Sequence, residues 1–364
     1  MKPDATTRPP IRVLVVDDSA FMRTALSRMI ASEPTLEVVA TAASGSEALD
    51  KIAALDPDVV TLDIEMPGLD GLQTLRCIMK RFPRPVIMVS GASEHSAENT
   101  FDALAAGAFD YVPKKLSPTS LDILHIQSDL VAKILAAAHS RRKAHPPDIL
   151  ARKPPQSSVL EDHDRTFSSR AAIVALGTST GGPQALQEML PLLPRDLSVP
   201  ILIVQHMPLG FTAPFAQRLN SLCSVAVREA THGESVQPGV VYLAPAGKHM
   251  RVERLSPLQT ILCLDTHPED CLHIPSIDVL LNSVAAAYHN LALGIILTGM
   301  GSDGAKGMQA IFREGGLTIG QDEATCVVYG MPRVCAELGV LTRVASLSRI
   351  PACILEATRS RKLA

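Results

Sequence analysis

The chain has 364 residues, and at about 100–200 residues per domain this length predicts two or three domains. Its net charge is −3, it has no Trp, and only 3% of its residues are aromatic, which argues against nucleic-acid binding. Residues 1–10 are polar and lack the apolar stretch of a signal peptide, and no run of about 18 apolar residues predicts insertion into a membrane. The seven cysteines are scattered without a CxxC pair, as in reduced cytoplasmic proteins. We therefore expect a cytoplasmic protein.

Residues 10–128 are predicted to form a first domain, in which short β-rich runs alternate with helical patterns. After the first run, Met22, Leu26, Met29 and Ile30 recur on one face of a helix. Five strands with helices between them predict a doubly wound α/β domain with a five-stranded parallel sheet. The strand candidates are Ile11–Val16, Val38–Ala42, Val59–Leu62, Val86–Val89 and Tyr111–Val112.

Residues 129–170 are assigned to a linker. Its clearest part, Ser140–Arg170, contains an Arg-Arg-Lys run, two Pro-Pro pairs, and many charges and serines. The basic run is interpreted as solvated charge rather than as a docking site for an acidic partner.

Residues 171–358 are predicted to form a second doubly wound, mainly parallel α/β domain. Several of its strand candidates are continuous apolar runs, which are typical of strands buried on both faces. The candidates are Ala172–Leu176, Ile201–Val204, Val225–Arg228, Val240–Leu243, Ile261–Leu264, Leu293–Leu297 and Leu317–Ile319.

Polar side chains follow four of the predicted strands in the first domain. Asp17 and Asp18 end the first strand, and Asp63 ends the third. Carboxyl ends of parallel strands share one edge of the sheet, so these acids would repel one another unless a hard cation such as Mg²⁺ lay between them. Ser90 ends the fourth strand and Lys114 follows the fifth, where a hydroxyl and an ammonium are suited to phosphoryl oxygens. The set predicts a phosphorylation site with Asp63 as nucleophile.

These residues resemble the response-regulator receiver domain, which has a flavodoxin-like fold. The resemblance implies that Asp63 is the phosphoacceptor, that Asp17 and Asp18 hold Mg²⁺ with it, that Ser90 is the switch hydroxyl, and that Lys114 senses the phosphate. The matching segments are Val15-Val16-Asp17-Asp18-Ser19, Leu62-Asp63-Ile64-Glu65-Met66-Pro67-Gly68-Leu69-Asp70-Gly71, Ser90-Gly91 and Gly107-Ala108-Phe109-Asp110-Tyr111-Val112-Pro113-Lys114.

A Gly/Ser-rich turn opens the second domain. Gly177-x-Ser179-x-Gly181 lies between a buried strand and a helical pattern, where a serine hydroxyl stands exposed on a tight turn. The turn alone is equally compatible with a phosphate cradle, although it lacks the P-loop ending and the GxGxxG spacing.

Two further residues turn this motif into a candidate catalytic triad. His206 follows the next strand, and Asp303 follows the long apolar strand Leu293–Leu297. With Ser179 they all fall at carboxyl ends of predicted parallel strands, so a hydroxyl, an imidazole base and an orienting carboxylate share one edge. The order Ser, His, Asp along the chain excludes the α/β-hydrolase fold, which runs Ser, Asp, His.

The combination is similar to the CheB-type chemotaxis protein-glutamate methylesterase/glutaminase family, over nearly the whole chain. The resemblance implies that Ser179 is the nucleophile, His206 the general base and acid, and Asp303 the orienting carboxylate. It also implies that the main-chain N–H groups near Thr180 and Met300 bind the oxyanion. The matching segments are Gly-Thr-Ser-Thr-Gly-Gly, Gln-His-Met-Pro and Thr-Gly-Met-Gly-Ser-Asp-Gly-Ala, with Thr178 replacing the Ala common in that family.

By this resemblance the chain demethylates glutamate methyl esters on methyl-accepting chemoreceptors, releasing methanol, and deamidates receptor glutamines. The implied phosphodonor is the histidine kinase of the chemotaxis system, with Mg²⁺ in the receiver and no cofactor in the hydrolase. The alternative is a receiver-gated signalling scaffold whose second domain binds a partner without turnover. A transcription factor is excluded because no basic helix-turn-helix follows the linker. The receptor, its glutamates, the kinase and the oligomeric state stay open.

The other histidines of the second domain have no metal-binding spacing and are interpreted as structural. For His249, a place in the substrate groove is the less favoured alternative. This group comprises His232, His249, His267, His273 and His289.

Overall fold

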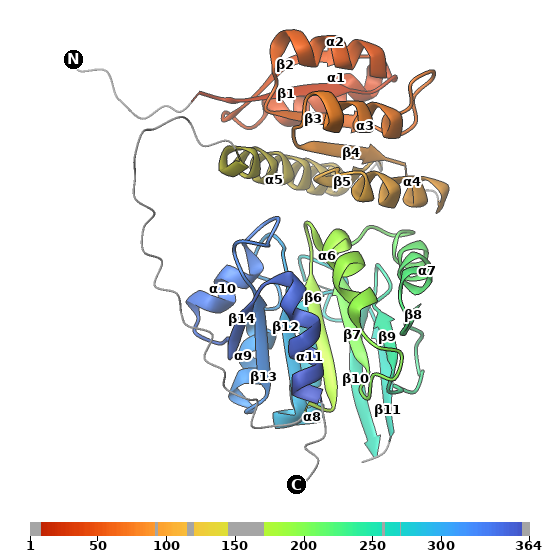
Figure 1. Ribbon diagram of the computed structural model, residues 1–364, viewed down its shortest axis with the longest axis vertical. Helices are drawn as coiled ribbons and strands as arrows, with labels where there is room; N and C mark the ends of the chain where they lie inside the picture. The colour runs from red at the N-terminus through yellow and green to blue at the C-terminus, as the bar shows by residue number, and fades with distance from the viewer. Residues whose placement is uncertain are drawn as a thin grey trace, which may run out of the picture. The chain divides into compact units, whose positions relative to one another are not determined.

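The computed structural model describes residues 9–91, 94–114, 120–144, 171–256, 259–269 and 271–358. The chain divides into two compact units, residues 1–148 and 149–364, and each is a parallel β-sheet flanked by helices (Figure 1). The expected pair of α/β domains is thereby confirmed. Within the described ranges, no helix is both long and apolar enough to cross a bilayer.

The first unit has a parallel sheet in the order β2-β1-β3-β4-β5 (Figure 1). Its core lies partly between the sheet and the paired helices α1 and α5, because alternate strand residues such as Val13 and Val15 point toward them. The elements are β1 (Ile11–Val16), α1 (Ala20–Ala31), β2 (Leu36–Ala42), α2 (Gly45–Leu55), β3 (Val59–Asp63), α3 (Gly71–Arg81), β4 (Val86–Ser90), α4 (Glu94–Ala105), β5 (Asp110–Pro113) and α5 (Ser120–Ala144).

Short polar side chains begin three of these helices. The Ser19 hydroxyl accepts a hydrogen bond from Met22 N at the start of α1, and Ser44 caps α2 in the same way. The Asp70 carboxylate accepts from Gln73 N at 2.7 Å and starts α3. Such caps are worth about 1 kcal/mol each. Those of α1 and α3 fix where the helices begin after the loops that carry the acidic residues.

Helix α5 extends the first unit beyond its predicted limit. Leu130, Ile134, Ala137 and Ala138 recur at i, i+4, i+7 and i+8, and all four are buried in the core of the first unit. The predicted domain boundary at residue 128 is therefore too early. The many polar residues of this helix resemble a linker sequence, although its apolar residues are spaced to form one buried face. The rest of the predicted linker, 145–170, lies outside the described residues.

Replacing Ile134 by alanine tests whether α5 is integral to the first unit. Ile134 is fully buried, so Ile134→Ala is expected to destabilise that unit by about 2–5 kcal/mol. Urea unfolding of the full chain, followed by the transition of the first unit, measures the change. Leu222→Ala is the control, because Leu222 is 48% exposed. An unchanged first-unit transition in Ile134→Ala would show that α5 adds no packing energy.

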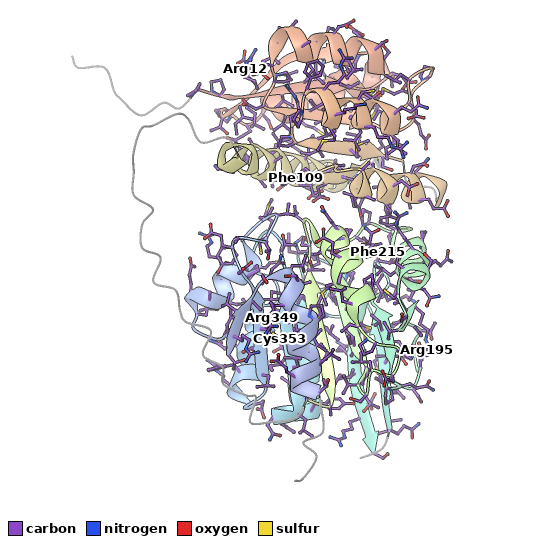
Figure 2. All side chains as sticks on the ribbon, in the orientation of Figure 1. Arg12, Phe109, Arg195, Phe215, Arg349 and Cys353 are labelled. Atoms are coloured by element: carbon purple, nitrogen blue, oxygen red, sulfur yellow. The ribbon has the colours of Figure 1, made fainter. Side chains whose placement is uncertain are left out.

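The second unit has a seven-stranded parallel sheet in the order β14-β13-β12-β6-β7-β9-β8 (Figure 1). Helices α8, α9 and α10 share one core, and residues such as Phe215 on α7 and Cys353 on α11 are buried among the other side chains (Figure 2). The elements are β6 (Ile173–Thr178), α6 (Gly182–Met189), β7 (Ile201–Gln205), α7 (Thr212–Leu222), β8 (Ala226–Glu229), β9 (Val240–Leu243), β10 (His249–Ser256), β11 (Gln259–Asp265), α8 (Ile277–Tyr288), β12 (Ala292–Ile296), α9 (Ala305–Arg313), β13 (Leu317–Gln321), α10 (Met331–Glu337), β14 (Arg343–Ala345) and α11 (Ile350–Thr358).

Two strands of this unit stand apart from the main sheet. The predicted run Ile261–Leu264 lies in β11, which pairs antiparallel with β10, a strand that the sequence prediction missed. Met250 and Val252 of β10 alternate with more polar residues and pack into the core near α8. The two-stranded β10–β11 ribbon therefore buries only one of its faces, whereas the central strands of the parallel sheet are buried on both faces. The short edge strand β14 was also missed.

Candidate active site and phosphorylation site

Three adjacent strands of the second unit carry the Ser, His and Asp residues predicted from the sequence. Ser179 follows β6, His206 follows β7, and Asp303 lies in the loop between β12 and α9. These strands are neighbours in the order β12-β6-β7 and run parallel, so their carboxyl ends meet at one edge of the sheet. In open α/β sheets that edge is where ligands bind.

Four donors orient the carboxylate of Asp303. His206 Nε2 lies 2.8 Å from Oδ2, which also accepts from Ile277 N at 2.7 Å. Oδ1 accepts from the Ser276 hydroxyl at 2.9 Å and from Asp278 N at 3.0 Å. Burial by itself would raise the pKa of Asp303, but the bond to His206 and the donors at the start of α8 hold that pKa well below its usual range. Asp303 is therefore a fixed anion beside the imidazole.

The bond to Asp303 decides which nitrogen of His206 is available as a base. An ionised carboxylate only accepts hydrogen bonds, so Nε2 carries the proton and Nδ1 presents a lone pair. Nδ1 is buried and, in the described part of the chain, has no hydrogen-bond partner. Ser179 is half-buried at the adjacent strand end. Of the two links expected in a triad, the His–Asp hydrogen bond is formed, whereas no hydrogen bond joins Ser179 to His206 among the described residues. The unpartnered Nδ1 is the acceptor that the serine hydroxyl would need.

Hydrogen bonds of two threonines, Thr178 and Thr298, connect the turn that carries Ser179 to the loop after β12. Thr298 O accepts both Ser179 N at 3.1 Å and the Thr178 hydroxyl at 2.9 Å, while the Thr298 hydroxyl donates to Thr180 O at 2.9 Å. Thr178 and Thr298 are buried. The threonine that replaces the family's Ala therefore adds a bond between the two segments instead of straining the turn.

Gln205, the last residue of β7, links the serine turn to the histidine. Its side-chain amide donates to Ser179 O and to His206 O, each at 3.0 Å. A Cβ atom on Gly182 would lie 2.1 Å from Gln205 Oε1, so only glycine permits this close approach. The sequence prediction missed Gln205, which looked like an ordinary residue at a strand end.

Two main-chain N–H groups near Ser179 remain available for an oxyanion. Ser179 N itself is occupied by Thr298 O. Over the described residues, the N–H groups of Thr180 and Met300 donate to no protein acceptor. These are the two positions that the family resemblance implied.

A second imidazole, which the sequence prediction had interpreted as structural, lies against His206. The rings of His206 and His273 are stacked with centroids 4.0 Å apart and planes 23° apart. His273 precedes α8 and has no motif that would single it out in the sequence.

The first unit brings its predicted acids and lysine together. Ligand oxygens of Asp17, Asp18 and Asp63 lie within 4.8 Å of one another. Lys114 Nζ lies 3.1 Å from Asp17 Oδ2 and 2.6 Å from Asp63 Oδ2. Gly71 lets the start of α3 lie close to the end of β3, since a Cβ atom there would lie 2.0 Å from Asp63 O.

This cluster fits a hard divalent cation. Asp17 and Asp63 are buried, and the partner that the structure gives their Oδ2 atoms is the Lys114 ammonium. The carboxylate oxygens of Asp17 and Asp63 can therefore coordinate a cation, and the exposed Asp18 offers a third oxygen ligand. Burial raises the pKa of Asp63 to about 6, against the opposing effect of Lys114. The charge of a bound cation would likewise favour the ionised form of Asp63.

Ser90 lies beside this cluster, but its hydroxyl belongs to a different network. Ser90 O accepts Lys114 N at 2.7 Å, whereas Ser90 Oγ accepts from the Thr100 hydroxyl at 2.7 Å and lies 3.2 Å from Ser96 O. The Ser96 hydroxyl donates in turn to Glu65, two residues after Asp63. The predicted switch hydroxyl is thus tied to α4 rather than to Asp63.

A receiver-type acidic site on one unit and a Ser–His–Asp arrangement on the other define a response regulator with an enzymatic output unit. Residues 13–124 match the response regulator receiver domain model, and residues 174–354 match the CheB methylesterase model. The chain belongs to the CheB methylesterase family, with a receiver domain ahead of the methylesterase domain.

Similar proteins cover almost the full length. The protein-glutamate methylesterase/protein-glutamine glutaminase 2 of Nitratidesulfovibrio vulgaris is 47% identical over 95% of this chain and 98% of its own. The protein-glutamate methylesterase/protein-glutamine glutaminase 1 of Oleidesulfovibrio alaskensis is 44% identical over 95% of this chain and 99% of its own. The crystal structure of the Thermotoga maritima CheB methylesterase catalytic domain is 39% identical, with a TM-score of 0.50, over 51% of this chain and 98% of that one.

Proposed function

We propose that this protein is a phosphorylation-activated hydrolase that serves chemotactic adaptation. It demethylates glutamate methyl esters on methyl-accepting chemoreceptors and deamidates specific receptor glutamines. The observation that carries the proposal is the His206–Asp303 hydrogen bond at the strand edge that also bears Ser179, with Nδ1 left as a base. The names of the full-length relatives favour turnover over the alternative of a binding scaffold.

The reaction follows from the roles of five groups. The Ser179 hydroxyl attacks the γ-ester carbonyl and gives its proton to His206 Nδ1, while Asp303 stabilises the imidazolium. The N–H groups of Thr180 and Met300 receive the oxyanion. His206 then protonates the departing methoxide, so methanol leaves and an acyl-serine remains. Water, deprotonated by His206, releases glutamate and restores the serine; with glutamine, ammonia leaves instead.

The receiver controls this reaction through Asp63. Asp17, Asp18 and Asp63 would hold Mg²⁺, which when bound neutralises charge on a phosphoryl group. The Asp63 carboxylate accepts the phosphoryl group from the histidine kinase of the chemotaxis system, forming an acyl phosphate, and Lys114 pairs with its oxygens. Ser90 leaves its bonds to α4 and turns to the phosphate.

Methanol release from methylated receptor membranes tests the proposal. We expect turnover by the full chain, and an increase of about 5–150-fold with a small phosphodonor and Mg²⁺, the range of ordinary allosteric couplings. Folded protein that releases no methanol under either condition would exclude the hydrolase and leave the scaffold.

Replacing Asp63 by asparagine tests the phosphorylation site. Asp63→Asn keeps the shape of the side chain but removes the carboxylate nucleophile, so incorporation of phosphate and the rise in methanol release should both disappear. Basal release should remain. Asp50→Asn, an exposed change on α2, is the control and should behave as wild type. Retention of one aspartyl phosphate per chain by Asp63→Asn would assign the phosphoacceptor elsewhere.

A further inference from the structure

The ring of His206 is held at one edge only. Its Nε2 is bonded to Asp303, whereas Nδ1 has no hydrogen-bond partner in the described part of the chain. The terminal torsion of a histidine side chain is broad, so one hydrogen bond at the ring edge does not by itself fix the orientation of the ring. A base that must accept a proton from a particular hydroxyl needs a second restraint, because small misplacements cost large factors in rate.

The stacked imidazole supplies a restraint of the right kind. The His273 ring lies on the face of His206 with centroids 4.0 Å apart and planes 23° apart. We propose that His273 is a positioning residue: its flat ring holds His206 in the orientation in which Asp303 keeps Nε2 and Ser179 can reach Nδ1. This inference rests on the hydrolase function proposed above.

His273 is itself anchored by a buried histidine. His249 is fully buried; its Nε2 lies 3.0 Å from Pro268 O, and its Nδ1 accepts from Ser276 N at 3.0 Å. The two bonds hold both ends of the segment that carries His273. Ser276 also donates to Asp303, so the segment that places the stacked ring also places the carboxylate. The ring stack and the His206–Asp303 hydrogen bond therefore depend on the same segment.

The chemistry of the base requires a flat ring at this position. When His206 takes the serine proton it becomes a cation, and an aromatic face beside a cation stabilises it. Both the steric and the electrostatic effect come from the planar π-system of His273. Phenylalanine should therefore replace His273 in this role, whereas leucine should not.

Two variants of the full chain separate these properties. His273→Leu removes the planar ring at similar bulk, and His273→Phe keeps it. With methylated receptor membranes and a phosphodonor, we expect His273→Leu to lower kcat about tenfold with KM unchanged, since a rate factor of ten reflects about 1.4 kcal/mol in the barrier. His273→Phe should stay within about threefold of wild type. Thermal unfolding establishes that both variants are folded.

Nitrogen-detected imidazole NMR supplies a readout that does not depend on turnover. In wild type and His273→Phe, His206 should show a single tautomer with the proton on Nε2, and in His273→Leu a mixture. Three results would overturn the inference: wild-type kcat in folded His273→Leu, a rise in KM alone, or equal losses in both variants with an unchanged His206 spectrum. If wild type itself releases no methanol, the proposed hydrolase fails, while the spectra still decide whether His273 orients His206.

Discussion

Methylated receptor mixed with the Ser179→Ala protein should release no methanol above background, a loss of up to about 10⁶-fold in kcat. The substitution deletes the single oxygen that attacks the ester. It leaves Ser179 N and Ser179 O, which bond to Thr298 and Gln205, in place. We therefore expect a folded protein with an unchanged unfolding temperature and unchanged phosphorylation of Asp63.

The control for this variant is Ser221→Ala, which removes an exposed hydroxyl on α7. It should release methanol at the wild-type rate. If Ser179→Ala released methanol at a rate near that of Ser221→Ala, Ser179 would not be the nucleophile. The Gly/Ser-rich turn would then be better explained as an anion-binding turn.

The second large effect is expected from Asp303→Asn, at about 10⁴-fold in kcat. An asparagine amide that donates to Nε2 forces the proton of His206 onto Nδ1, where it blocks acceptance of the serine proton. The single side-chain oxygen of asparagine then keeps the bonds from the Ser276 hydroxyl and Asp278 N, whereas Ile277 N loses its acceptor. A modest loss of stability therefore accompanies the loss of rate.

Methanol release and the imidazole spectrum of His206 together check this prediction. The spectrum of Asp303→Asn should show the proton on Nδ1. Asp196→Asn, an exposed change in the turn before β7, should leave both the spectrum and the rate as in wild type. A rate loss in Asp303→Asn with the Nε2 tautomer retained would mean that Asp303 acts by charge alone.

The strand ends were the most predictable part of the molecule. Central parallel strands such as β6, β7 and β12 are largely apolar runs, so the loop that follows each run, with its polar residues, is visible in the sequence. Residues at such ends necessarily share an edge, which is why the sequence alone groups Ser179, His206 and Asp303. The same reasoning placed Asp17 and Asp63 next to Lys114.

Residues that act through long-range packing could not be predicted. His273 lies in a loop, and its contact with His206 depends on how His249 anchors that loop. Similarly, the tie between Ser90 and Thr100 depends on the packing of α4 against β4. The β10–β11 ribbon was different, because alternation at Met250 and Val252 was present in the sequence but was overlooked among the longer apolar runs.

The spread of the catalytic residues along the chain has a consequence for protein synthesis. Ser179 leaves the ribosome long before Asp303, because β12, the neighbour of β6 that leads to Asp303, is made late. Thr298 N also needs Gln321 as its acceptor, so the loop that completes the site is secured later still. A partly translated chain thus carries a serine without an oriented base. Hydrolytic competence therefore arises only after Gln321 has been made, by which time the receiver, a separate folding unit, has already emerged.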